Sequence, residues 1–454
     1  MEPHAHEYDP ALAVAHATAR AVVEQLPTRA AAAGASAPAP VPLPPGIGAE
    51  AALAWFQSRW AHGLSASPGP RYWGFVTGGA TPAALAADWL AAAYDQNASN
   101  DVGSLATAME REALGWLREM FGLPAAFDGA LVSGATAANT VALAAARQAV
   151  LARQGVDVAA EGLAGAPPIT VLAGAAHASI DKALAILGIG RSALLRLPLE
   201  PESTRLDPTA LGAALSGLSG APAIVVASAG EVTTGSFDDL RAIAELCRRH
   251  AAWLHIDGAF GLFAALLPDG AQRLDGIDAA DSIATDLHKW LNVPYDAGLV
   301  FTRDASLARA VFRASSAYLG EHGDPLHGTP ENSRRLRALP AWMTLAAYGR
   351  DGVAGWVARD CALARRFAAG LATIPGVEVL HPVDLNVVTF ALREGDAARR
   401  DRVLAGLAAD GRVFLTPTVL FGRPALRGAL ANWSTLDGDV ELALSALREV
   451  LAAS

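Results

Sequence analysis

The feature that most constrains this chain is a repeated alternation of short apolar runs with longer helical segments. The runs ITVLA, AIVVAS and WLHID are rich in β-branched or aromatic residues, and helical segments separate them. Short buried strands joined by crossover helices form a largely parallel sheet with helices on both faces. Such sheets bind ligands beyond the carboxyl ends of their strands. We therefore expect an α/β fold with its ligand site at those ends.

The same pattern divides the chain into three parts. Residues 1–72 hold alanine-rich helical segments around a proline-rich connector at 34–46, and they predict a helical arm without a core of its own. Residues 73–308 carry the strand–helix alternation and predict a large domain. Residues 309–454 begin with a polar loop and continue with a long helix, strands at VEVL and LNVVTFAL and a last helix. They predict a smaller C-terminal α/β domain.

Composition excludes several classes of protein. The net charge is −10 and no stripe of lysine or arginine stands out, so we expect no nucleic-acid partner. No window offers the roughly 18 uninterrupted apolar residues of a membrane span, and the N-terminus lacks the pattern of a signal peptide, which predicts a cytoplasmic protein. Two cysteines, Cys247 and Cys361, are too few for a disulfide framework or a cysteine metal site, and no metal is expected.

An acid and a lysine at the ends of two apolar runs suggest two partners of one ligand. Asp257 ends WLHID, where a lone buried carboxylate is costly and needs a cationic partner. Lys289 follows the run DSIATDLH, and lysines at such positions form Schiff bases with carbonyl compounds; an ordinary surface lysine is the alternative. Pyridoxal 5'-phosphate (PLP) would satisfy both residues, because its protonated pyridine nitrogen needs a carboxylate. The small Ala259 would let a flat ring approach.

Two further features are consistent with PLP. The turn Ser133-Gly134-Ala135-Thr136 opens a helix, where backbone N–H groups and the helix dipole suit a phosphate; ordinary helix capping is the alternative. His177 ends another strand and could lay its imidazole on an aromatic ring; a structural histidine is the alternative. Together, the turn at Ser133, His177, Asp257 and Lys289, in this order along the chain, indicate a PLP site more strongly than any one of them.

With these residues the chain resembles the group II PLP-dependent amino-acid decarboxylases, which include the aromatic amino acid and glutamate decarboxylases. The resemblance covers roughly residues 70–440 and rests on GFVTGG, SGATAAN, HASIDKA, GSFDDL, HIDGAFG, TDLHKWLNVPYDAG and PENSRRLRALPAW. It implies a fold-type I enzyme with an arm, a mainly parallel seven-stranded-type sheet carrying PLP, and a small C-terminal domain. It also implies a homodimer with active sites at the interface.

The resemblance also implies roles for individual residues. Lys289 would be the catalytic Schiff-base lysine, Asp257 would pair with the pyridine nitrogen, and His177 would stack on the ring and assist catalysis. Ala259 would lie against the other side of the ring, and Ala135, Thr136 and His288 would hold the phosphate. The cofactor-binding set is then Ser133, Gly134, Ala135, Thr136, His177, Thr233, Asp257, Ala259, His288 and Lys289.

Substrate contacts are implied at four positions. Phe75 and Val76 would give an apolar contact to the substrate. Arg427 would meet a carboxylate, with a structural salt bridge as the alternative. The short loop HGDPLHGTPENSRR lacks the tyrosine that protonates the carbanion in authentic decarboxylases. Tyr318 lies upstream of this loop, and His327 is the nearest residue able to transfer a proton.

Two other departures from the family pattern lie near the cofactor. Glu231 and Val232 occupy the places of a Thr-Thr pair, so the expected contact from this segment falls to Thr233. Asp286 stands where many members have asparagine, close to the phosphate. A second acid there would be unfavourable, so we expect Asp286 to point elsewhere.

The sequence therefore predicts a PLP-dependent lyase that acts on an amino acid, with α-decarboxylation to an amine as the leading reaction. The missing loop acid leaves open another carbon–carbon lyase or aldolase, or an aldehyde-forming decarboxylase, on the same scaffold. A non-catalytic PLP-binding homologue is the alternative of a different class.

Overall fold

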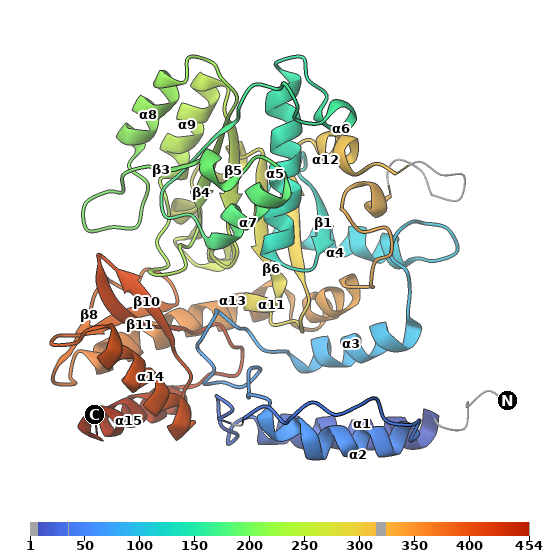
Figure 1. The fold of residues 1–454 in the computed structure, drawn as a ribbon, viewed down its shortest axis with the longest axis vertical. Coiled ribbons are helices and arrows are strands. Elements are labelled where there is room, and N and C mark those ends of the chain that lie inside the picture. The colour runs from blue at the N-terminus through green and yellow to red at the C-terminus, as the bar shows by residue number, and fades with distance from the viewer. Residues whose placement is uncertain (1–7, 35, 315–323, 454) are drawn as a thin grey trace.

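The computed structural model describes residues 8–34, 36–314 and 324–453, which form two sheets with surrounding helices and an N-terminal arm (Figure 1). The strands are β1 (Asp128–Val132), β2 (Thr170–Ala173), β3 (Leu194–Arg196), β4 (Ala223–Ser228), β5 (Trp253–Asp257), β6 (Ser282–Asp286), β7 (Gly298–Thr302), β8 (Val377–Val379), β9 (Val387–Leu392), β10 (Thr416–Leu420) and β11 (Arg423–Ala429). The α-helices are α1 (Tyr8–Gln25), α2 (Ala49–Arg59), α3 (Pro82–Tyr94), α4 (Ala106–Met120), α5 (Ala135–Ala152), α6 (Val158–Glu161), α7 (Ala178–Ile186), α8 (Pro208–Gly217), α9 (Leu240–His250), α10 (Gly270–Arg273), α11 (Leu287–Trp290), α12 (Ala305–Phe312), α13 (Ala338–Leu371), α14 (Ala397–Asp410) and α15 (Asp437–Ala453).

The larger sheet has seven strands in the order β1-β7-β6-β5-β4-β2-β3. Neighbours from β6 to β3 pair in parallel, whereas β7 is antiparallel to both β1 and β6. A short connection joins β6 to β7, and without a crossover helix the chain returns in the opposite direction. The prediction of a mainly parallel seven-stranded sheet is confirmed.

Helices cover both faces of this sheet, as the alternation along β4 shows. Ile224 and Val226 belong to a core with α5, α7 and α12, whereas Val225 and Ala227 belong to a core with α8, α9 and α13. Successive residues of a strand point to opposite faces, so an uninterrupted apolar run is buried on both sides. This arrangement leaves the strand ends as the place where polar side chains of the sheet can meet a ligand.

The smaller sheet is antiparallel, in the order β10-β11-β9-β8. Its core joins α14, α15 and the second half of α13, with Phe367, Phe390 and Leu447 among the buried side chains. Figure 1 shows this part in orange and red beside the larger sheet. The predicted small C-terminal α/β unit is confirmed.

The N-terminal arm packs differently from the rest. Helices α1 and α2 lie against each other, and neither contains a buried residue. Figure 1 shows them in blue at the edge of the molecule. Among the described helices, none is long and apolar enough to span a membrane.

Helix α11, which carries Lys289, is anchored to α13 by a buried tryptophan. The indole N–H of Trp290 donates to Oδ2 of Asp360 at 2.8 Å, and the carbonyl of Trp290 accepts from the indole of Trp356 at 2.8 Å. Asp360 is fully buried, and this burial raises the pKa of its carboxyl group to about 8. The pair therefore holds the lysine-bearing turn through a carboxyl group that is neutral at pH 7.

Replacing Asp360 by asparagine should change how stability depends on pH. The folded-state pKa of about 8 exceeds the ordinary value of 3.8, so this group's contribution to stability falls as the pH rises through that range. As the pH rises from about 5 to 8, the free energy of unfolding of D360N should increase by up to about 4 kcal/mol relative to that of the wild type. Urea unfolding of both proteins at about pH 5 and 8 measures the difference in unfolding free energy. A difference that does not change with pH would contradict the raised pKa of Asp360.

Candidate active site

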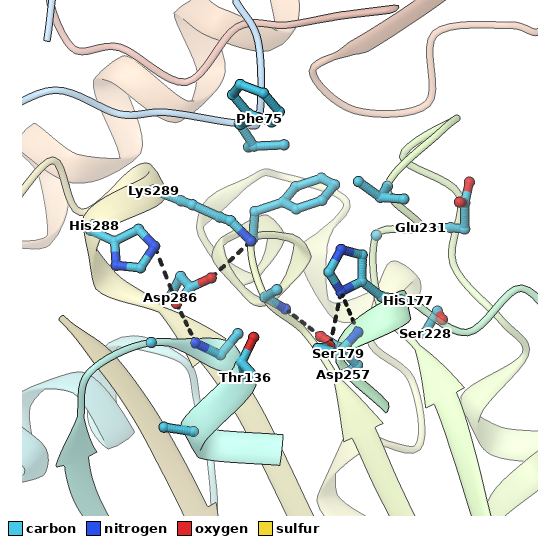
Figure 2. A pocket seen from close by; sticks show the side chains of 18 of the residues that line it. Phe75, Thr136, His177, Ser179, Ser228, Glu231, Asp257, Asp286, His288 and Lys289 are labelled. Atoms are coloured by element: carbon cyan, nitrogen blue, oxygen red, sulfur yellow. Dashed lines mark hydrogen bonds and ion pairs between the residues drawn. The ribbon is translucent and has the colours of Figure 1, made fainter. Parts of the chain in front are cut away.

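A cavity of about 460 Å³ lies at the carboxyl ends of β4, β5 and β6, beside the N-terminus of α5 (Figure 2). Three adjacent strands end there in Ser228, Asp257 and Asp286. The cavity brings together most of the residues predicted from the sequence, which are Phe75, Val76, Ser133, Gly134, Ala135, Thr136, His177, Asp257, Ala259, His288, Lys289 and Arg427.

Two predicted residues do not line this cavity. Thr233 lies in the turn after β4, and its carbonyl accepts from the hydroxyl of Thr389 on β9. The same turn instead presents Glu231 and Val232 to the cavity. His327 is buried in a short 3-10 helix, Pro325–His327, where its Nδ1 accepts from the backbone N–H of Ala314 at 3.3 Å. Tyr318 and the start of the short loop lie outside the described residues.

The centre of the site is a buried acid without a basic partner. Asp257 is 8% exposed, and no salt bridge to it occurs within the described part of the chain. Its Oδ1 accepts from the backbone N–H of Ala259 at 3.2 Å, and its Oδ2 accepts from Nδ2 of Asn139 at 3.1 Å. Both oxygens keep further lone pairs, so a cationic N–H group entering the cavity would find an acceptor.

Asn139, near the N-terminal end of α5, orients this acid through a buried network. Its Oδ1 lies 2.9 Å from Nε2 of His255, and Nδ1 of His255 lies 2.9 Å from the hydroxyl of Ser282. Burial lowers the pKa of His255 to about 4, although Asp257 acts in the opposite direction. The ring is therefore neutral at pH 7 and donates from Nε2 to Asn139, while the indole N–H of Trp253 donates to the Ser282 hydroxyl at 3.0 Å. Each donor meets an acceptor, which turns the amide N–H groups of Asn139 toward Asp257.

The second amide N–H of Asn139 extends the network to His177. It donates to the hydroxyl of Ser179 at 3.0 Å, and that hydroxyl lies 2.8 Å from Nδ1 of His177. The backbone N–H of Ser179 also donates to the same ring nitrogen at 3.2 Å. Because Nδ1 accepts, the proton of a neutral ring lies on Nε2. Figure 2 shows the imidazole projecting into the cavity above Asp257.

The turn before α5 forms an anion cradle. A Cβ on Gly298 would lie 2.4 Å from Cα of Gly134, so β7 passes directly against the turn and only glycine fits there. His288 lies beside it, with Nδ1 accepting from the N–H of Ala297 at 3.4 Å, which leaves Nε2–H facing the cradle. Burial lowers the pKa of His288 despite the opposing effect of Asp286. The cradle thus offers neutral N–H donors at a helix N-terminus, which suits a phosphate.

Asp286 corrects one expectation, because it points into the cradle. Its Oδ1 accepts from the N–H of Ala135 at 2.5 Å, and its Oδ2 lies 2.8 Å from Nζ of Lys289. Figure 2 shows the contact with Lys289 as a dashed line from the carboxylate of Asp286. The residue is 3% exposed and cannot turn toward solvent without losing both partners. A second acid therefore shares the region expected for the phosphate.

The mouth of the cavity combines an apolar and a basic side. Phe75 and Val76 adopt positive φ angles of 60° and 55°, a conformation that costs energy for such side chains, and Phe75 remains 62% exposed. Arg427 is buried, and its Nη1 donates to the carbonyl of Val232 at 2.9 Å. Burial lowers the pKa of Arg427, its Nε has no hydrogen-bond partner, and no salt bridge to it occurs among the described residues.

These residues fit PLP. The buried, cation-free carboxylate of Asp257 suits a protonated pyridine nitrogen, and the cradle at Gly134 to Thr136 suits a phosphate. Lys289 projects into the same cavity from α11, opposite His177 (Figure 2). A Cβ on Gly78 would lie 1.6 Å from the carbonyl oxygen of Lys289, so the GFVTGG segment packs against the backbone of the lysine turn.

Comparisons with known proteins agree with this site. Residues 57–393 match the family model described as the pyridoxal-dependent decarboxylase conserved domain. The chain is 30% identical over 345 residues to an aromatic-L-amino-acid decarboxylase of Bacillus atrophaeus, covering 74% of this chain and 70% of that protein. It is also 30% identical over 382 residues to the L-2,4-diaminobutyrate decarboxylase of Rhizobium meliloti (strain 1021), covering 81% and 74%. The crystal structure of Oryza sativa TDC with PLP and tryptamine superposes with a TM-score of 0.89 at 24% identity, covering 100% of this chain and 99% of that one.

The chain belongs to the pyridoxal-dependent decarboxylase family. It is a PLP-dependent carboxy-lyase of the amino-acid decarboxylase group, and the predictions of family, fold, cofactor and enzyme class are confirmed.

Sequence reasoning missed several residues of the site. Asn139 lies in an alanine-rich helix, where an asparagine is unfavourable unless its amide is used, and that was the available signal. Ser179 lies two residues after His177 and carried no separate signal. Ser228 ends an apolar run as Asp257 does, and its position at a strand end could have identified it.

Replacing Asn139 by alanine should affect stability and cofactor binding together. The substitution removes donors to Asp257 and Ser179 and an acceptor for His255, so we expect a loss of about 2–4 kcal/mol in unfolding free energy. PLP should bind about tenfold more weakly, because Asp257 loses its orientation. Urea unfolding and absorbance titration with PLP measure the two effects. Q148A, a matched change of a buried polar side chain on the same helix, should leave the titration unchanged; an unchanged titration in N139A would contradict the positioning role.

Proposed function

We propose that this protein removes the α-carboxyl group of an amino acid as carbon dioxide and releases the amine. The observation that carries the proposal is the buried carboxylate of Asp257, which has no cationic partner among the described residues and faces the same cavity as Lys289. When bound, PLP supplies an electron sink that accepts the electrons of the broken bond. Asp257 is the group that keeps the pyridine nitrogen protonated, and the Asn139 network keeps Asp257 in place.

Lys289 and His177 are the residues that we propose to transfer protons. Lys289 projects from the short helix α11, whose backbone packs against Gly78 and is anchored through Trp290. The backbone position from which its amine extends is therefore fixed. The Nε2 atom of His177 faces the cavity because Nδ1 is held by Ser179. Since His327 lies outside this cavity, His177 is the better placed of the two histidines to hold or move a proton at the substrate.

The residues at the mouth of the cavity suit a substrate that has an apolar side chain and a carboxylate. We propose that Phe75 and Val76 contact the side chain and that Arg427 binds a carboxylate. Arg427 lines the cavity and forms no salt bridge among the described residues, so a substrate carboxylate would supply a counter-charge for its guanidinium. Relatives named for aromatic amino acids and for 2,4-diaminobutyrate show similar identity, so relatedness favours neither side chain.

An aldehyde-forming decarboxylation is a second candidate. The segment 322–335 contains no tyrosine, so the usual acid of the loop is missing from the sequence there. Where no residue protonates the product carbon rapidly, dioxygen would act as a two-electron oxidant with water as co-reactant. The products would then be aldehyde, carbon dioxide, ammonia and hydrogen peroxide in place of the amine.

A screen of amino acids with carbon dioxide, amine and aldehyde all measured tests the proposed reaction. We expect carbon dioxide and amine in equal amounts; aldehyde with carbon dioxide would favour the second candidate, and aldehyde without carbon dioxide would exclude decarboxylation. The chain has two lysines, Lys182 and Lys289, and Lys182 is exposed on α7. K289A should lose at least about a thousandfold in kcat, whereas K182A should retain activity. Comparable turnover in K289A would contradict its role.

We also propose a cytoplasmic homodimer with domains at 1–72, 73–308 and 309–454. The arm of a single chain leaves Leu12, Trp55, Phe56 and Trp60 at least 37% exposed, and a second copy would cover this apolar surface. The exposed Phe75 at the cavity mouth would then lie near the partner.

Sedimentation velocity tests the assembly. A species of about twice the monomer mass of 46.6 kDa is expected, and F56E should weaken it by placing a charge on the covered face. A single 46.6 kDa species, or recovery of the protein outside the cytosolic fraction of its host, would contradict this proposal.

A further inference from the structure

Asp286 brings a buried carboxylate to donors that a phosphate group needs. The N–H of Ala135 is the first donor of α5, and it donates to Oδ1 of Asp286 at 2.5 Å. Nε2 of His288 lies 3.4 Å from the same carboxylate oxygen. The second oxygen lies 2.8 Å from Nζ of Lys289. One side chain therefore contacts both the cradle and the lysine that takes the cofactor's aldehyde.

The charges around Asp286 do not cancel in the presence of a phosphate. Burial lowers the pKa of His288, which disfavours a charged imidazolium beside Asp286. Among the described residues, the salt-bridge contacts of Asp286 are His288 and Lys289, which leaves Lys289 as its cation. A phosphate at the cradle would lie beside a carboxylate that is 3% exposed, and like charges repel strongly where water cannot screen them.

We propose that Asp286 acts as an internal competitor of the cofactor, opposing its phosphate at the α5 cradle and its aldehyde at Lys289. Asp286 thereby sets how firmly pyridoxal 5'-phosphate is retained. It makes the phosphate a weaker anchor than the helix N-terminus alone would provide. It also supplies the counter-ion of Lys289 whenever the amine is free. This inference rests on the cofactor assignment but not on the reaction catalysed.

The two effects of Asp286 separate when PLP is compared with pyridoxal, which lacks the phosphate. Removing the charge changes the environment of Lys289 for both compounds, whereas the repulsion at the cradle affects PLP alone. The ratio of the two dissociation constants therefore isolates the phosphate. Asparagine is the matched replacement, because its Oδ1 can still accept from the N–H of Ala135 while the charge is gone.

The test is absorbance and fluorescence titration of wild type, D286N and D286S with PLP and with pyridoxal at pH 7.5. We expect D286N to raise the preference for PLP over pyridoxal by about tenfold or more, with D286S changing in the same direction. The inhibition constant of inorganic phosphate against PLP should also be lower in D286N and in D286S than in the wild type. If D286N does not fold, D286S and the phosphate competition carry the same test.

D439N is the control, since Asp439 is a buried aspartate at the start of α15 that pairs with Arg71 and does not line the cavity. It should leave the preference unchanged. An unchanged or smaller preference in D286N and D286S would overturn the proposal. A wild-type protein that binds neither compound would overturn it together with the cofactor assignment, whereas failure to decarboxylate any amino acid would leave these binding ratios unaffected.

Discussion

The site depends on a carboxylate that is buried without a cation of its own. Burying Asp257 is costly unless hydrogen bonds hold it and a positive group completes it. The structure supplies the hydrogen bonds through Ala259 and Asn139, and we propose that the ring nitrogen of the cofactor supplies the cation. Beyond Asn139 the network includes His255, whose pKa of about 4 keeps it neutral at pH 7. Among the described residues, none forms a salt bridge to Asp257 that would neutralise it in place of the ligand.

The sheet explains how residues distant in sequence meet around this acid. Parallel strands β4, β5 and β6 end at one edge and place Ser228, Asp257 and Asp286 side by side. The antiparallel β7 then brings Gly298 against Gly134, which fixes the cradle next to β6. Because Asp286 directly precedes α11, the cradle and the lysine turn share one carboxylate. Competition between Asp286 and the cofactor thus follows from the order of the strands.

Residues at or just after the end of a strand could be predicted from the sequence, because the carboxyl ends of parallel strands meet at one edge of the sheet. This holds for Asp257, His177 and Lys289, whose chemistry also belongs to a single cofactor. The sequence does not indicate which side chains of a turn face a cavity; it favours Thr233, whereas the chain presents Glu231 and Val232. Long-range contacts were equally hidden, which is why Asp286 was expected to point away and the role of Asn139 was missed. The direction of β7 is not indicated either, since an apolar run does not show whether a strand is parallel or antiparallel to its neighbours.

The most direct test of this account is a crystal structure of the protein with PLP bound. We expect a covalent link to Lys289, the phosphate at the N-terminus of α5, and the pyridine nitrogen about 3 Å from the carboxylate of Asp257. A ring nitrogen that contacts any other group, with Asp257 left without a cation, would contradict the central claim that one buried acid organises the site.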